Sequence, residues 1–115
     1  MIVDDISFMR SMLRSILESA GYEVVGEATS GKDALEAYAK LDPDLVLMDI
    51  VMPAMDGLNA TQALKRYDPR ARVVICSAMG QRETVLRAMQ AGASDFIIKP
   101  FTPGRVLEAV RKALR

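Results

Sequence analysis

The sequence predicts an α/β fold, a three-layer αβα sandwich in which helices cover both faces of a five-stranded parallel sheet. Two observations lead to this prediction. Short, mostly β-branched apolar runs alternate along the chain with amphipathic segments of helical period. Five such strand–helix units within 115 residues also favour a single doubly wound sheet with right-handed crossovers.

The first two strand–helix units occupy the amino-terminal part of the chain. The first strand is predicted at residues 1–3, and an apolar stripe over residues 8–20 predicts the helix behind it. The second strand is predicted at residues 24–25. Ser30 is then a good N-cap for a helix whose apolar stripe spans residues 34–41.

The other three units continue the same alternation. Their strands are predicted, in chain order, at residues 45–48, 73–76 and 96–98. The helix after the first of these begins near Asp56, and the next helix closes at Gly92. The last helix has Thr102 as its cap and Pro103 in its first turn, where proline is favoured.

The composition excludes several classes of function. Fifteen basic residues balance fifteen acidic ones, which argues against strong attraction to nucleic acid or to an anionic membrane. The chain has no His, which excludes His-based catalysis and His-ligated metals, and the single Cys76 excludes an intramolecular disulfide. No apolar run is long enough for a membrane span and no signal peptide opens the chain, so we expect a cytoplasmic location without membrane insertion.

Polar side chains follow four of the predicted strands. Asp4 and Asp5 come after the first strand, Asp49 after the third, Ser77 after the fourth and Lys99 after the fifth. The carboxyl ends of parallel strands meet at one edge of the sheet, which is where open α/β sheets bind ligands. We therefore expect these five side chains to line one cleft.

A cleft of this kind suits a cation and a phosphoryl group. Three carboxylates in one place repel one another, and Mg²⁺ would relieve the repulsion. A Lys, a hydroxyl and backbone amides are the groups that hold phosphoryl oxygens. The sequence contains no glycine-rich phosphate loop. The phosphoryl group is therefore expected on the protein itself, on a carboxylate, rather than on a tightly held nucleotide.

These residues resemble those of a known family, the receiver domains of two-component response regulators. The resemblance covers nearly the whole chain in order and spacing, and it rests on Asp4-Asp5, on Asp49 within residues 47–57, on Ser77-Ala78 and on Lys99-Pro100-Phe101. It implies one receiver domain over residues 1–115, with a flavodoxin-like strand order 2-1-3-4-5. The first strand is shorter at its amino end than the family usually has. Within the family, the chain is most similar to the stand-alone chemotaxis regulators.

The resemblance gives each residue of the cleft a role. Asp49 would accept a phosphoryl group from a histidine kinase. Asp5, Asp49 and the backbone carbonyl of Val51 would bind Mg²⁺, and Asp4 would act mainly through water. Lys99 would pair with the phosphoryl oxygens.

Ser77 and Phe96 match the two switch positions of the family. Ser77 would hydrogen-bond the phosphoryl group and move toward it, and Phe96 would turn inward as Ser77 vacates space. The Lys99–Pro100 peptide bond is expected to be cis.

The resemblance also implies partners. They are a histidine kinase as phosphodonor, a flagellar motor switch protein and a phosphatase. The chain would act as a monomer, and it would catalyse only its own phosphoryl uptake and loss.

Other functions stay open at this point. A phosphatase with an Asp nucleophile commonly has a second acid two residues later, where this chain has Val51. A flavin-binding protein needs a phosphate loop after the first strand and aromatic walls, but here two Asp follow that strand and Trp is absent. A receiver domain of a longer transcriptional regulator fits the same motifs. Taken singly, Asp4-Asp5 could cap a helix and Phe96 could be a core aromatic residue.

Overall fold

A five-stranded parallel sheet forms the middle layer of the molecule, and its strand order is β2-β1-β3-β4-β5. The computed structural model describes residues 1–115. The strands are β1 (Ile2–Val3), β2 (Glu27–Ala28), β3 (Val46–Met48), β4 (Val73–Ser77) and β5 (Asp95–Ile98). The predicted fold class and strand order are confirmed.

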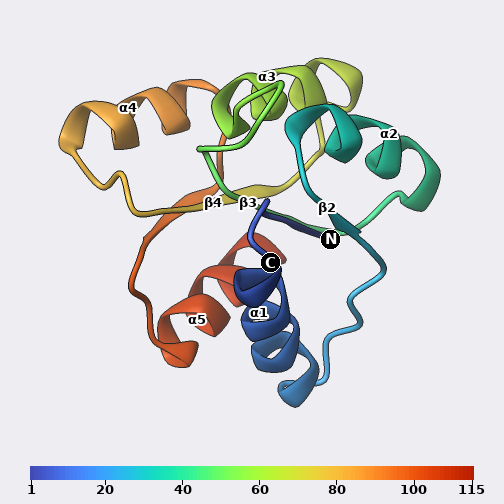
Figure 1. The fold of residues 1–115 in the computed structure, drawn as a ribbon, viewed down its shortest axis with the longest axis vertical. Helices are drawn as coiled ribbons and strands as arrows, with labels where there is room; N and C mark the ends of the chain where they lie inside the picture. The colour runs from blue at the N-terminus through green and yellow to red at the C-terminus, as the bar shows by residue number, and fades with distance from the viewer.

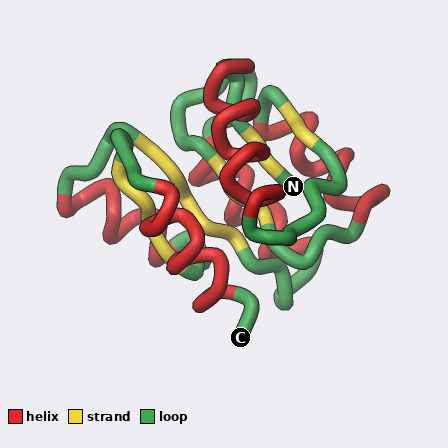
Figure 2. The backbone as a smooth tube through the Cα atoms, turned by 90° about the horizontal axis from the view of Figure 1, so that it is seen from below, coloured by secondary structure: helices red, strands yellow, loops and turns green.

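Five helices cover the two faces of this sheet, as Figure 1 shows. The helices are α1 (Ser7–Ser19), α2 (Gly31–Leu41), α3 (Gly57–Tyr67), α4 (Arg82–Gln90) and α5 (Pro103–Ala113). Helices α2, α3 and α4 lie on one face, and α1 and α5 lie on the other. Figure 2 shows the second face from below, with the strands running behind the helices.

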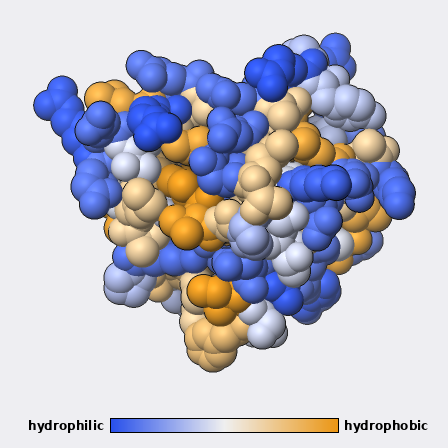
Figure 3. All heavy atoms as spheres, turned by 45° about the horizontal axis from the view of Figure 1, so that its top comes forward, coloured by the Kyte–Doolittle hydropathy of each residue, from blue (hydrophilic) through white to orange (hydrophobic).

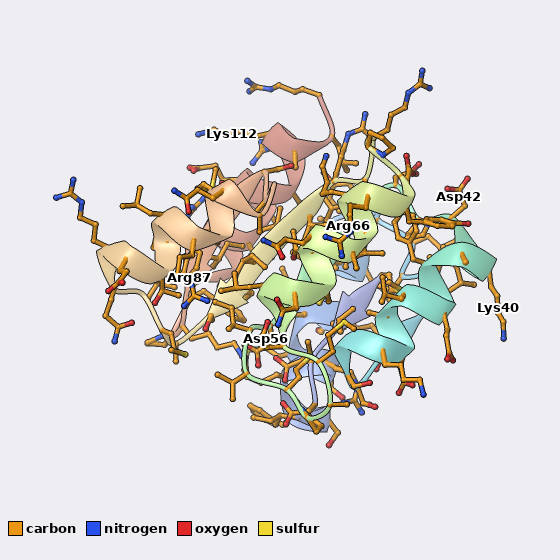
Figure 4. The ribbon with its side chains drawn as sticks, turned by 90° about the horizontal axis from the view of Figure 1, so that it is seen from above. Lys40, Asp42, Asp56, Arg66, Arg87 and Lys112 are labelled. Atoms are coloured by element: carbon orange, nitrogen blue, oxygen red, sulfur yellow. The ribbon has the colours of Figure 1, made fainter.

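Each face of the sheet buries its own apolar cluster. Ile2 packs into the cluster under α1 and α5, whereas the next residue, Val3, packs into the cluster under α2 and α3. Successive residues of a strand point to opposite faces, so a strand that is covered on both sides must be apolar throughout. Charged side chains such as Lys40 on α2 and Arg66 on α3 remain on the outer surfaces of the helices (Figure 4).

The predicted helix caps are confirmed. The Ser30 side chain accepts a hydrogen bond from the amide of Asp33, and Thr102 does the same for Arg105. Asp56 caps α3 by accepting from the amide of Asn59. Each cap satisfies one of the amides that the first turn of a helix leaves free.

The prediction of the second strand at residues 24–25 is wrong. The amide of Ile2 donates to the carbonyl oxygen of Gly26 at 3.1 Å, and Ile2 and Val3 pair with β2 in register. Strand β1 is only two residues long, so residues 24–25 have no strand beside them. The ladder instead begins at Gly26.

The apolar stripes are also less buried than their spacing suggests. Phe8 on α1 is 69% exposed, and Leu86 and Met89 on α4 are exposed as well. Helix α1 buries Leu13 and Leu17, which lie further along the same predicted stripe. None of the helices has the length and apolar character that a membrane span requires.

Candidate functional site

The five polar residues predicted for the cleft do come together at the carboxyl end of the sheet. Val3 of β1 pairs with Met48 of β3, so the residues that follow, Asp4 and Asp49, sit side by side. Oxygen atoms of Asp4, Asp5 and Asp49 lie within 4.8 Å of one another.

The ends of β4 and β5 complete the cleft. Ser77 ends β4 in register with Ile98 of β5. The amide of Lys99, the next residue, donates to the carbonyl oxygen of Ser77 at 2.9 Å. The parallel register is therefore what delivers these side chains to one place.

Lys99 lies between two buried carboxylates. Its Nζ is 3.0 Å from Oδ2 of Asp4 and 3.5 Å from Oδ2 of Asp49. Asp4 is 1% exposed and Asp49 is 7% exposed, whereas Asp5 is open to solvent. The ammonium group compensates charge that would otherwise be costly to bury.

Burial and charge both shift the ionisation of this group of residues. Burial raises the pKa of Asp49; Lys99 opposes the shift, and the charge of Asp4 adds to it. Burial by itself would lower the pKa of Lys99, but the hydrogen bond to Asp4 and the charges of Asp49 and Asp4 raise it above its ordinary value. Lys99 is therefore a firmly protonated cation, and Asp49 is a carboxylate whose charge is only partly compensated.

The three carboxylates differ in how much of their acceptor capacity is used. Asp4 accepts from the amide of Ile6 through Oδ1 and from Lys99 through Oδ2. Asp49 accepts from the amide of Ile50 at 2.8 Å through Oδ1. Asp5 makes no side-chain hydrogen bond. Clustered carboxylate oxygens are the ligands that a hard divalent cation prefers, so the donor set of the cleft fits Mg²⁺.

The loop after β3 places Val51 at the surface. This side chain is 61% exposed. Gly57 keeps the loop closed, because a Cβ at this position would overlap the carbonyl group of Asp49. Its amide donates to the carbonyl oxygen of Ile50 at 2.8 Å.

Ser77 and Phe96 occupy the same face of the sheet. Ile75 pairs with Phe96 and Ser77 pairs with Ile98, and residues two apart along a strand share a face. Ser77 is buried, and its Oγ accepts from the amide of Met79 at 3.1 Å. It does not cap α4, whose N-cap is Gln81.

Phe96 is buried within the apolar cluster of this face, so its ring already points inward in this structure. The Lys99–Pro100 peptide bond is cis, which is the isomer expected from the sequence.

Sequence reasoning missed Arg10. Its guanidinium donates to the carbonyl oxygen of Asp4 at 2.8 Å and to Glu27 at 2.9 Å, which ties the end of β1 to β2. It also missed the contact between Gly57 and Asp49. The Asp56-Gly57 pair is a visible turn signal, but nothing in the sequence marks Arg10.

Comparison with known proteins identifies the family of the chain. Residues 1–111 match the family model described as the response regulator receiver domain. The chain belongs to this family.

Relatives of this receiver domain include chemotaxis proteins. It is 54% identical to the chemotaxis protein CheY of Thermotoga maritima, over 97% of this chain and 93% of that protein. It is 54% identical to CheY of Bacillus subtilis, over 99% of this chain and 95% of that protein. A crystal structure of the CheX–CheY–BeF₃–Mg²⁺ complex from Borrelia burgdorferi aligns with a TM-score of 0.96 at 34% identity, covering 99% of this chain and 87% of that one.

The charge cluster predicts how replacement of Asp49 changes stability. The pKa of Asp49 is raised in the folded protein, so ionised Asp49 costs stability at pH values above its unfolded pKa of about 3.9. Asp49→Asn keeps an acceptor for the amide of Ile50 and removes the charge. In excess chelator at pH 7 we expect this variant to melt at a higher temperature than the parent chain.

The pH dependence provides the control for this prediction. Below about pH 3 both chains carry a neutral group at this position, and the difference in melting temperature should vanish. Thermal unfolding followed by circular dichroism measures both points. An Asp49→Asn variant that melts at or below the temperature of the parent at pH 7 would contradict the assignment of Asp49 as an incompletely compensated buried charge.

Proposed function

We propose that this receiver domain is a phosphorylation-driven switch that takes a phosphoryl group on Asp49 from a histidine kinase. The observation that carries the proposal is the geometry of the cleft: a buried carboxylate, two more acids and an ammonium group meet at one edge of the sheet. Membership of the receiver family supports the same role.

Asp49 is the nucleophile in this proposal. An oxygen of its carboxylate attacks the phosphorus of a phosphohistidine, and the imidazole of the kinase leaves. Lys99, which lies 3.5 Å from Asp49, pairs with the phosphoryl oxygens. Asp5, Asp49 and the backbone carbonyl of Val51 would hold Mg²⁺, which neutralises negative charge that gathers during the transfer. Both oxygens of Asp4 already accept hydrogen bonds, which supports a role for Asp4 through water.

Movements of Ser77 and Phe96 would connect phosphorylation of Asp49 to a change in the surface of the domain. A phosphoryl group on Asp49 attracts the hydroxyl of Ser77 away from the amide of Met79. Ser77 shares its face of the sheet with Phe96, whose ring is already buried there, so the movement of Ser77 would leave room into which that ring settles further. The phosphoryl group thereby favours one of two arrangements of β4 and β5.

The output surface would be formed by α4, β5 and α5. Leu86 and Met89 on α4 and Ile98 on β5 are large apolar side chains left exposed there. Figure 3 shows one face of the molecule, on which hydrophobic atoms reach the surface among hydrophilic ones. A partner that covers these side chains would remove apolar area from water, which favours docking.

The partners proposed are those of a chemotaxis pathway. The curated relatives are named chemotaxis proteins, and the Borrelia burgdorferi structure is named as a complex of CheY with CheX. A flagellar motor switch protein would bind the phosphorylated form, and a separate phosphatase would reset it. The monomeric state and the location in the cytoplasm stay predictions.

The alternatives from the sequence are less well supported. An Asp-nucleophile phosphatase would need a second acid two residues after Asp49, and this chain has the exposed Val51 at that position. The chain would catalyse only its own phosphoryl uptake and loss. A receiver domain within a longer transcriptional regulator stays an alternative.

Intact mass spectrometry tests the proposed function. With acetyl phosphate and Mg²⁺ we expect the chain to gain the mass of one phosphoryl group, because Asp49 lies beside Lys99 while both oxygens of Asp4 are already engaged in hydrogen bonds. The matched control is Asp49→Asn, which should gain none. Excess chelator should abolish the labelling of the parent chain, because the clustered acids need a compensating cation. Equal labelling of the parent in chelator, or labelling of the Asp49→Asn variant at another site, would rule out the proposed mechanism.

Two residues near the cleft are expected to set how long the phosphoryl group stays on Asp49. Hydrolysis needs a water that attacks in line, and side chains that orient this water speed the loss. Val51 and Met79 stand two residues after Asp49 and Ser77, and both are exposed. Neither can hold a water by a strong hydrogen bond. Loss of an ordering interaction of about 1–3 kcal/mol means roughly 5- to 150-fold slower decay, so we expect a long-lived phosphoryl state.

The variant Val51→Asn with Met79→Glu tests this expectation. Decay of phospho-Asp49 in excess Mg²⁺ should be faster in the double variant than in the parent chain. A double variant that decays no faster would show that these two side chains do not set the lifetime.

A further inference from the structure

Arg105, at the start of α5, reaches across to the outer edge of the sheet. Its guanidinium group donates to both carboxylate oxygens of Asp95 in a bidentate ion pair, the Arg105–Asp95 fork. Nη2 lies 3.2 Å from Oδ1, and Nη1 lies 3.3 Å from Oδ2. Nη2 also donates to the carbonyl oxygen of Phe96 at 3.0 Å. One side chain of α5 is therefore bonded to two successive residues of β5, in a planar geometry that a Lys ammonium could not reproduce.

Asp95 completes the contact from the other side. Its Oδ1 accepts from the amide of Phe96 at 2.7 Å. Strand β5 is an outer strand of the sheet, and the free side of such a strand has no neighbouring backbone to bond with. Asp95 and Arg105 together bind both polar backbone groups of Phe96, so this ion pair fixes the backbone of β5 at that residue.

The pair also joins the two layers of helices. The side chain of Phe96 packs among Ile75 and Ala88, on the α4 side of the sheet. Arg105 is followed on α5 by Val106, which packs with Ile97 on the opposite side. Any shift of the Phe96 backbone must therefore either move Arg105 on α5 or break the bonds that Phe96 makes with Arg105 and Asp95.

The cleft is coupled to the same strand. The amide of Lys99, three residues after Phe96, is bonded to Ser77, and Ser77 and Phe96 share one face of the sheet. In this structure the Phe96 ring is already buried on that face while Ser77 still accepts a hydrogen bond from the amide of Met79. An interaction that keeps the ring inward therefore lets Ser77 move toward Asp49 without a compensating movement of Phe96.

We propose that Arg105 is a positioning residue for the switch: together with Asp95 it fixes the backbone of Phe96 with the ring inward, and thereby favours the arrangement that accepts a phosphoryl group on Asp49. The inference rests on the proposed function. An interaction that stabilises one of two arrangements raises the affinity for a ligand that selects that arrangement. Arg105 thus acts on the cleft through β5 without touching the phosphoryl group.

Beryllofluoride, a tetrahedral stand-in for the phosphoryl group, provides the test. Its affinity for the chain is measured by titration in saturating Mg²⁺ for the parent, Arg105→Gln, Asp95→Asn and the double variant. Each single variant should bind about fivefold more weakly, at the low end of ordinary coupling between sites because the pair is partly exposed. The double variant should bind beryllofluoride no more weakly than the weaker-binding of the two single variants, because both substitutions remove the same contact.

Two matched variants distinguish a positioning role of Arg105 on β5 from a general effect of charge on the affinity for beryllofluoride. Glu108 also pairs with Arg105, at 3.3 Å, but it forms no hydrogen bond or ion pair with β5, so Glu108→Gln should bind beryllofluoride as the parent does. Arg105→Lys keeps the charge and loses the fork, and its affinity should lie between those of the parent and Arg105→Gln. The amide signal of Phe96 in ¹⁵N spectra should shift in Arg105→Gln and not in Glu108→Gln.

The outcomes separate this inference from the proposed function. Parent affinity in Arg105→Gln and Asp95→Asn, or an equal loss in Glu108→Gln, overturns the role of Arg105. A parent chain that fails to bind beryllofluoride, or an Asp49→Asn variant that binds it equally well, overturns the proposed function instead. Thermal unfolding of each variant establishes that it is folded at the temperature of the titration.

Discussion

One ammonium group between two buried carboxylates sets the charge balance on which the cleft depends. Lys99 contacts Asp4 at 3.0 Å and Asp49 at 3.5 Å, and without it two negative charges would face each other away from water. The compensation is incomplete, because the pKa of Asp49 remains raised. A cation bound in the cleft would compensate the remaining negative charge. A carboxylate that is buried beside an ammonium group is also well placed to carry a phosphoryl group.

The parallel sheet is what makes this arrangement possible. Every strand of such a sheet ends at the same edge, so a polar residue after each apolar run is delivered to one place. The strands themselves must be apolar on both faces, since helices cover both. The same strands that carry Ser77 and Lys99 also carry the core residues Ile75 and Phe96. A change at the cleft is therefore mechanically connected to the packing beneath α4.

Most of the fold and of the candidate site could be predicted from the sequence because the signals are local. Ser30, Asp56 and Thr102 cap helices through bonds to residues three positions away, and the acids and Lys99 directly follow their strands. The second strand could not be placed, because its position depends on the register with β1 and not on the apolar pair at residues 24–25. The contacts of Arg10 and Arg105 also escaped prediction, since each joins elements that only the tertiary fold brings together.

Backbone amide chemical shifts, recorded as Mg²⁺ and beryllofluoride are added to the full chain, test the switch most directly. We expect changes at Asp49, Ser77 and Lys99 together with changes on the surface formed by α4, β5 and α5, at Val85, Phe96 and Arg105. The second set follows because Ser77 and Phe96 share a face of the sheet and β5 is bonded to α5. Changes confined to the cleft, with none on α4, β5 and α5, would show that the group binds without switching the surface.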